Sequence, residues 1–295
     1  MSIIETHRLT KKYGKYRGIT ELDLSIEEGE FFGFIGPNGA GKSTTIRTLL
    51  GLIKPTSGSA EIFGKDIIKA HREILADIGY MPSEANFYST MTADEIIKLS
   101  ARLRKRDCSA EAARLCERLG VDRKKRIEEL SLGNKKKVSI VCALQHEPRL
   151  CILDEPTSGL DPLMQKEFFD ILRERNEKGS TIMLSSHILS EIQKNCDRAA
   201  IIKEGRLTAL DSVENLSRTA AKRVTLHGIS AVPVGLEAVD VNSAEGSVSF
   251  LYSGGIPKLI TALGGLDITD MTVTEPDLEE IFMHYYEKEK GGERR

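Results

Sequence analysis

A glycine-rich segment of this 295-residue chain has the residue types and spacing to hold phosphate groups. Its glycines let backbone N–H groups approach phosphates closely, and the start of a helix after it adds positive potential. Lys42 is expected to reach the β- and γ-phosphates of a nucleotide, and the Ser43 hydroxyl is expected to bind Mg²⁺. The segment matches the pattern G-x-x-x-x-G-K-[ST] and reads Gly36-Pro37-Asn38-Gly39-Ala40-Gly41-Lys42-Ser43.

Two carboxylates, Asp154 and Glu155, follow the apolar run at 150–153. Such a run is typical of a strand buried on both faces, and ligands bind at the carboxyl ends of such strands. Asp154 is positioned to hold Mg²⁺ through water, and Glu155 to polarise the water that attacks the γ-phosphate. Alone, the pair is more typical of a solvated strand end. With the phosphate loop upstream, triphosphate hydrolysis is the better interpretation.

The elements that must position these residues alternate between strands and helices, which predicts an α/β fold with a mainly parallel core sheet. Residues 1–30 predict short antiparallel strands, including a half-exposed strand over 21–27. Residues 199–202 and 206–210 predict a hairpin at the edge of the core sheet. Buried strands are expected at 31–35, 150–153 and 181–184, and helices at 42–50 and 162–177.

Two further parts complete the predicted organisation. Thr92 and Glu95 form a capping box that opens a helix, and residues 90–146 predict a helical subdomain. The composition changes near residue 216, which divides a nucleotide-binding domain (1–215) from a small α+β accessory domain (216–295). In the accessory domain we expect strands at 223–227, 247–252 and 268–274, and helices at 257–263 and 277–289.

Composition excludes several classes of protein. Lysine and arginine number 42 against 44 acidic residues, so the net charge of −2 gives no bulk attraction for nucleic acid. The 5 cysteines are odd in number and contain no C-x-x-C pair, which argues against a disulfide framework or a zinc site. The N-terminus lacks the pattern of a signal peptide, and no window approaches the roughly 18 apolar residues of a membrane helix.

Taken together, the motifs resemble the nucleotide-binding subunit of an ATP-binding cassette (ABC) transporter over about residues 3–215. The resemblance implies a P-loop NTPase cassette that uses ATP and Mg²⁺ to power transport. Residues 272–282 resemble the tail of cassettes that serve exporters of drugs, antibiotics and polysaccharides. The matching motifs are Gly36–Thr44, Leu130-Ser131-Leu132-Gly133-Asn134, Ile152-Leu153-Asp154-Glu155-Pro156, Ser158-Gly159-Leu160-Asp161 and Ser186-His187.

The resemblance also implies roles for single residues. Tyr13 matches the aromatic residue that stacks on adenine, and His187 matches the switch histidine beside the γ-phosphate. Ser131 and Gly133 match the signature motif, which contacts ATP held by the other subunit. Asp161 matches a residue that communicates across the dimer. A complete site is therefore expected to need two subunits, as a homodimer or as a heterodimer with another cassette.

Two positions depart from the family pattern. The signature has Leu132 and Asn134 where the family usually has Gly and Gln. Ser83 stands where the family usually has a Gln that contacts the metal and links the nucleotide to the membrane subunit. Because Ser83 is shorter, we expect it to act on the metal through a bridging water, unless Glu84 substitutes for it.

The transport interpretation implies a separate multi-span membrane subunit and a location on the cytoplasmic face of the membrane. The expected docking region runs from Met81 to about Leu103 and includes Phe87 and Tyr88. The alternative is a soluble cassette ATPase that acts on ribosomes or nucleic acid through the basic runs at 102–106, 123–126 and 135–137. Nearby acids favour a solvated face for these runs, so no nucleic acid partner is expected. A kinase or GTPase would leave the signature-like segment and His187 unexplained.

Overall fold

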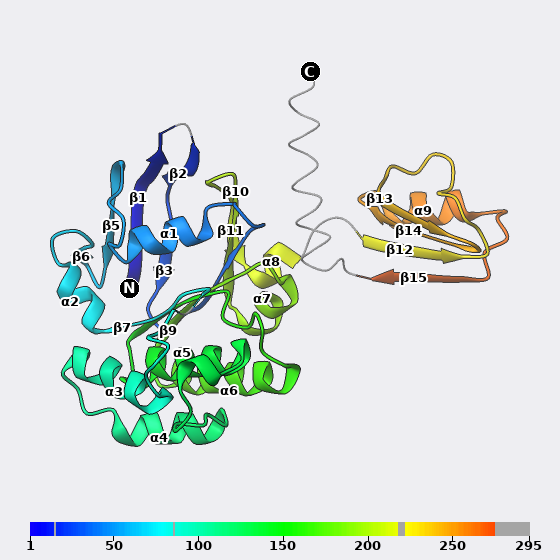
Figure 1. Cartoon of the computed structure of the whole chain (residues 1–295). Coiled ribbons are helices and arrows are strands. Elements are labelled where there is room, and N and C mark those ends of the chain that lie inside the picture. The colour runs from blue at the N-terminus through cyan, green and yellow to red at the C-terminus, as the bar shows by residue number, and fades with distance from the viewer. Residues whose placement is uncertain (15, 85, 218–221, 275–295) are drawn as a thin grey trace. The chain divides into compact units, whose positions relative to one another are not determined.

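The computed structural model describes residues 1–14, 16–84, 86–217 and 222–274 (Figure 1). Within the chain there are two compact units, Met1–Leu210 and Asp211–Arg295. The division falls slightly before the boundary expected at 215, and the short helix α8 (Val213–Ser217) therefore belongs to the second unit.

A six-stranded sheet forms the centre of the first unit, in the order β11-β10-β4-β9-β8-β7. The five strands from β10 to β7 are parallel, and β10 and β11 form the edge hairpin. All residues of β4, β8 and β9 are buried, as their apolar runs predict. The strands are β4 (Phe31–Ile35), β7 (Ile78–Met81), β8 (Leu150–Asp154), β9 (Thr181–Ser186), β10 (Arg198–Lys203) and β11 (Arg206–Ser212).

Both faces of β4 are covered, because its side chains alternate between two layers. Phe32 and Phe34 belong to a core that also contains Ile46 of α1 (Lys42–Leu49). On the other face, a Cβ at Gly33 would lie 2.5 Å from Ile192 of α7 (Leu189–Asn195), so the helix packs closely on the strand. Helix α6 (Pro162–Glu177) contacts β9.

Five antiparallel strands form a second sheet that shares the core of β4. They are β1 (Ser2–Tyr13), β2 (Tyr16–Leu22), β3 (Ser25–Glu27), β5 (Ser57–Ile62) and β6 (Lys65–Asp66). Two expectations were wrong here. The first strand is long, with 12 residues, and the alternating stretch at 21–27 is split between β2 and β3 rather than forming one strand. Buried Leu22, Leu24 and Ile26 still alternate with more exposed neighbours across the break.

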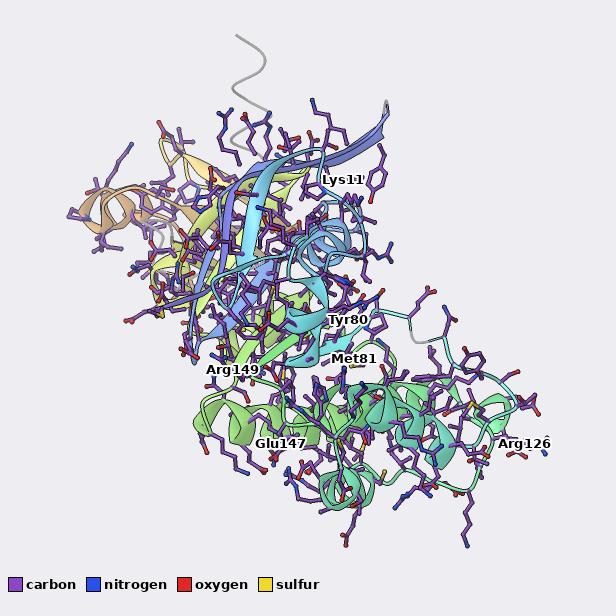
Figure 2. The ribbon with its side chains drawn as sticks, turned by 90° about the vertical axis from the view of Figure 1, so that its left-hand side faces the viewer. Lys11, Tyr80, Met81, Arg126, Glu147 and Arg149 are labelled. Carbon is purple, nitrogen blue, oxygen red and sulfur yellow. The ribbon has the colours of Figure 1, made fainter. Side chains whose placement is uncertain are left out.

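Helices fill the segment between β7 and β8, as predicted for 90–146. They are α3 (Ala93–Arg104), α4 (Ser109–Arg118), the 3-10 helix at Ile127–Glu129 and α5 (Leu132–Leu144), and α2 (His71–Ala76) precedes β7. The capping box of Thr92 and Glu95 is formed. Figure 2 shows Tyr80 and Met81 between two layers. The antiparallel strands with Lys11 lie on one side, and the helical layer with Arg126 and Glu147 lies on the other. Within the described parts of the chain, no helix is both long and apolar enough to cross a membrane.

The second unit contains a four-stranded antiparallel sheet in the order β13-β14-β12-β15. Its core joins Val224, Phe250 and Tyr252 of the sheet to Leu259 of α9. The elements are β12 (Lys222–His227), β13 (Ala238–Ala244), β14 (Ser247–Tyr252), α9 (Ile256–Leu263) and β15 (Asp270–Thr274). Strand β13 was not predicted. The expected helix at 277–289 lies outside the described residues.

Candidate functional site

The glycine-rich segment forms the loop between β4 and α1 (Figure 1). Gly41 occupies the N-cap position of α1 with a φ of 111°, a conformation that favours glycine. Gly36 and Ala40, near the two ends of the loop, are buried. The first turn of α1 has no acidic side chain, so no carboxylate there neutralises the partial positive charge at the helix N-terminus. A cavity of about 280 Å³ lies at this point, lined by Gly18, Pro37, Asn38, Gly39, Gly41, Lys42, Ser43, Thr44 and Glu155.

Three side chains from three segments meet at the edge of this cavity. Lys42 is 5% exposed, and its Nζ donates to the Gly36 carbonyl at 2.7 Å and lies 3.2 Å from Glu155 Oε1. Glu155 follows β8, and its Oε2 lies 2.9 Å from Nδ1 of His187, which follows β9. Because β8 and β9 are parallel neighbours, their carboxyl ends lie side by side. The arrangement combines a cation that can hold a phosphate with a carboxylate that can accept a proton.

The metal-binding candidates lie at the same edge of the sheet. Asp154 is 1% exposed and accepts a hydrogen bond from Ser185 Oγ at 2.7 Å. Ser43 lines the cavity, and half-buried Ser83 lies just beyond β7, the neighbour of β8. Among the described residues, no group of three or more His, Cys, Asp or Glu side chains is arranged to hold a metal by itself. This donor set fits Mg²⁺, which keeps few protein ligands and completes its shell with phosphate oxygens and water.

Tyr13 lies at the end of β1 and is 41% exposed. The Nζ of Lys11 lies 5.3 Å from the centre of its ring. Strand β1 pairs with β2, whose Gly18 lines the cavity, so Tyr13 belongs to a hairpin next to the phosphate loop. The ring itself is not one of the lining side chains.

Ser131, Gly133 and Asp161 lie at the N-terminal ends of two helices and do not line the cavity. The side chains of Ser131 and Asp161 cap α5 and α6 by accepting hydrogen bonds from backbone N–H groups at 3.4 Å and 3.0 Å. A Cβ at Gly133 would lie 2.8 Å from the Gly159 carbonyl, so glycine permits the start of α5 to approach the loop before α6. The structure thus separates these three residues from the phosphate loop of the same chain.

Lys136 is a residue of the site that the sequence analysis missed. The basic run at 135–137 was expected to form a solvated face, but Lys136 is 3% exposed. Its Nζ donates to the main-chain carbonyl of Glu155 at 3.0 Å. A helical signal was present, because Ile140 and Leu144 follow Lys136 at intervals of four on the buried face of α5.

Each of the other two basic runs contains an arginine that is paired with an acid. Arg106 lies 2.6 Å from Asp77, and Arg123 Nε donates to Asp94 at 2.9 Å. Pairing of this kind links elements of the helical part and favours a structural role for these side chains over phosphate binding.

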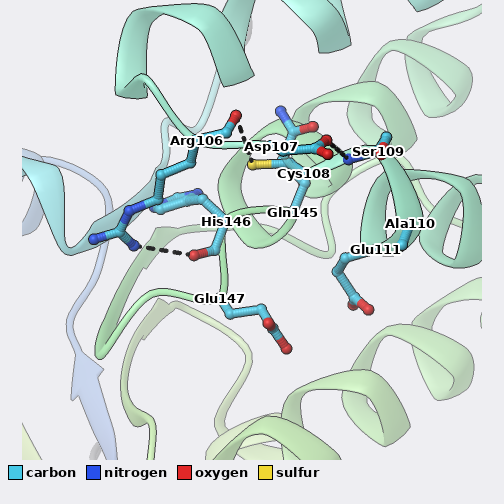
Figure 3. A pocket seen from close by; sticks show the side chains of 9 residues that line it. All are labelled: Arg106, Asp107, Cys108, Ser109, Ala110, Glu111, Gln145, His146 and Glu147. Atoms are coloured by element: carbon cyan, nitrogen blue, oxygen red, sulfur yellow. Dashed lines mark hydrogen bonds between the residues drawn. The ribbon is translucent and has the colours of Figure 1, made fainter.

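A larger hollow of about 590 Å³ lies in the helical part and contains none of the predicted site residues. It is lined by residues 106–111 and 145–147 (Figure 3). Arg175 of α6 is 2% exposed and pairs with Glu111 and Glu147, two of the lining residues. This hollow is a junction between helices joined by ion pairs.

His146, in the wall of this hollow, makes the stability of the protein sensitive to acid. It is 5% exposed, and burial lowers its pKa to about 4. As the pH falls below about 6.5, the unfolded chain takes up a proton that the folded chain does not. Above that pH the ring is neutral in both states, so His146 does not change the free energy of unfolding. By pH 4 about 3 kcal/mol of this free energy is expected to be lost.

Urea unfolding at several pH values checks this expectation. His146→Asn is expected to show a smaller loss of stability between pH 7 and pH 4 than the wild type. The same substitution at exposed His227 should leave the loss unchanged. Equal pH dependence in His146→Asn and the wild type would contradict the assignment.

Comparisons with known proteins identify the family of the chain. The ABC transporter family model matches residues 19–158. Bacitracin transport ATP-binding protein BcrA of Bacillus licheniformis is 36% identical over 301 residues, covering 96% of each chain. Linearmycin resistance ATP-binding protein LnrL of Bacillus subtilis (strain 168) is 31% identical and covers 96% of this chain and 97% of its own.

Solved structures give the same result. The ATP-binding subunit of an ABC transporter superposes with a TM-score of 0.68 at 32% identity, over 73% of this chain and 92% of its own. A dimeric bacterial ABC transporter cassette superposes with a TM-score of 0.66 at 25% identity, over 71% of this chain and 98% of its own. The predicted cassette fold is confirmed, and the relatives support the transport interpretation over action on ribosomes. The chain belongs to the ATP-binding subunits of ABC transporters, which hydrolyse ATP to drive transport.

Proposed function

We propose that Glu155 is the general base of ATP hydrolysis in this subunit. The observation that carries this is that one carboxylate contacts both Lys42 and His187, at 3.2 Å and 2.9 Å. Glu155 accepts the proton of the attacking water, and Nδ1 of His187 donates to Oε2 and fixes the direction of the carboxylate. Lys42 holds the β- and γ-phosphates and attracts the charge that develops on them.

The phosphate loop and the hairpin divide the recognition of ATP. Backbone N–H groups of residues 37–44 surround the phosphates, with the start of α1 behind them. Tyr13 stacks on the adenine ring from the end of β1, where its exposure leaves a face for the base. The loop thus holds the triphosphate of the substrate, and the aromatic residue holds the adenine ring.

We assign Ser43 and Asp154 as the protein's Mg²⁺ ligands, with Ser83 acting through water. When bound, Mg²⁺ would neutralise part of the negative charge of the triphosphate. The Asp154 carboxylate is buried, and its bond from Ser185 fixes one oxygen in place. The second oxygen remains a hard donor at the carboxyl end of β8, which suits this ion.

Ser83→Ala tests the proposed role of Ser83. Loss of one water-mediated hydrogen bond of about 1 kcal/mol is expected to raise the Mg²⁺ concentration for half-maximal ATPase about fivefold, with the maximal rate retained. The exposed Ser89 lies in the same connection, and Ser89→Ala is the matched control. An unchanged rate and Mg²⁺ dependence in Ser83→Ala would show that Ser83 has no ligand role.

The working unit in this proposal is a head-to-tail dimer, either of two copies or with a related cassette. Ser131, Gly133 and Asp161 lie at exposed or partly exposed helix ends, away from the cavity of their own chain. A second cassette brings these ends to the γ-phosphate of the ATP on this one. ATP binding then closes the dimer, and hydrolysis reopens it.

A multi-span membrane subunit is the proposed partner, which holds the cassette at the cytoplasmic face of the membrane. The docking region lies between Met81 and Leu103, where Tyr88 is 69% exposed and Leu103 is 77% exposed. The relatives named for bacitracin transport and linearmycin resistance favour an exporter of antibiotic-like compounds. Residues 1–215 act as the ATPase domain and 216–295 as an accessory domain.

The partner is tested by isolating the endogenous protein after gentle detergent extraction and identifying what accompanies it. Recovery of a multi-span membrane protein supports the proposal. Ribosomes or nucleic acid that dissociate as salt increases would overturn it, because charge-driven binding to phosphates weakens with ionic strength.

A further inference from the structure

The ammonium group of Lys136 is buried at the catalytic edge of the sheet. Lys136 is 3% exposed, although burying a cation is costly unless it is paired or hydrogen-bonded. Burial lowers the pKa of Lys136, and the carboxylates of Asp154, Glu155 and Glu84 act in the opposite direction. A lysine in such a place has a specific set of partners rather than a solvated charge.

The main chain of Glu155 is held from both sides. Lys136 Nζ donates to its carbonyl at 3.0 Å, and its own N–H donates to the Ser185 carbonyl at 3.0 Å. Glu155 has a φ of 47°, in the left-handed region, which costs free energy for a residue with a side chain. These two bonds stabilise the unusual turn that directs the carboxylate to Lys42 and His187.

The same helix reaches the proposed dimer interface. Lys136 lies in the second turn of α5, and Ser131 caps its first turn. The start of α5 packs against the Gly159 carbonyl in the loop that follows Glu155. A movement of α5 therefore acts on the segment after β8 at two points, the Lys136 bond and the contact at Gly133.

We propose that Lys136 is a positioning residue for Glu155, which joins the helix that meets the partner's nucleotide to the catalytic carboxylate of its own chain. This inference rests on the proposed function of Glu155 and of the signature residues. Engagement of the α5 N-terminus by a second cassette sets the position of Lys136, and Lys136 sets the turn at Glu155. Hydrolysis is thereby favoured in the closed dimer.

Steady-state ATPase assays on Lys136→Met test this role. Misplacement of a catalytic group by about 1 Å costs up to 100-fold, so kcat is expected to fall at least tenfold. KM for ATP should stay within about twofold, because the phosphate loop is untouched. Lys136→Arg keeps an N–H donor and is expected to recover most of the rate. If Lys136→Met does not fold, the rate of Lys136→Arg still tests the proposal. Lys135→Met, a change at the half-buried neighbour, should leave kcat unchanged.

A double-mutant cycle with Glu155→Gln separates the two proposals. If Lys136 acts only through the carboxylate, adding Lys136→Met to Glu155→Gln should change the residual rate less than twofold. A wild-type kcat in Lys136→Met or an inactive Lys136→Arg, with Glu155→Gln inactive, would overturn the role of Lys136 alone. A wild-type kcat in Glu155→Gln would instead overturn the proposed general base.

Discussion

Glu155→Gln is expected to lower kcat for ATP hydrolysis by roughly 100- to 10,000-fold, the contribution typical of a general base. Glutamine keeps the size of the side chain and its hydrogen bond to His187, but it cannot take the proton of the attacking water. Because ATP still binds, the variant should accumulate as an ATP-bound closed dimer. Single-turnover assays with radiolabelled ATP and light scattering with ATP and Mg²⁺ measure these two effects.

The control for this variant is Glu117→Gln, which changes an exposed carboxylate of α4 in the helical part. It should hydrolyse ATP at the wild-type rate and show no accumulation of dimer. A Glu155→Gln protein that stays monomeric with ATP and Mg²⁺ would contradict the closing dimer. Retained hydrolysis would contradict the role of the carboxylate.

Lys42→Met is expected to have the second largest effect, on ATP binding rather than on the chemical step alone. Lys42 is buried, and methionine fills similar space without the ammonium group. Charge-assisted hydrogen bonds contribute about 1.5–3 kcal/mol each, so the Kd for ATP should rise at least about tenfold. Isothermal titration calorimetry measures this change.

Lys69→Met is the matched control for Lys42→Met, because Lys69 is exposed and lies away from the phosphate loop in the sequence. Its Kd for ATP should equal that of the wild type. Equal ATP affinity in Lys42→Met and the wild type would show that the phosphates do not bind where the loop predicts.

The parallel core was predictable because its strands are buried on both faces. Residues 31–35 and 150–153 form nearly continuous apolar runs, which are typical of strands buried on both faces. Strand β13 gave no such signal. Its residues are mostly exposed, and an irregularity between Val239 and Asn242 interrupts the alternation, with Asp240 at a φ of 51°.

The site was predictable in parts. The spacing of the phosphate loop identifies Lys42 directly, since its residues are adjacent in sequence. The meeting of Glu155 with His187 depends on β8 pairing with β9, and only the family resemblance indicated it in advance. Lys136 was not predicted, because a run of three lysines is typical of a solvated surface. The hydrogen bond that accounts for its burial joins Lys136 to Glu155, which is distant in the sequence.

The separation of the start of α5 from the cavity has a genetic consequence. When the proposed dimer consists of two copies of this chain, each ATP uses Glu155 of one copy and Gly133 of the other. Gly133→Ala places a Cβ 2.8 Å from the Gly159 carbonyl and so disturbs the signature residues at the start of α5. A mixed dimer of a Glu155→Gln chain and a Gly133→Ala chain then has one site with both lesions and one site with none. Two alleles that are each inactive alone should therefore complement each other when they are expressed together.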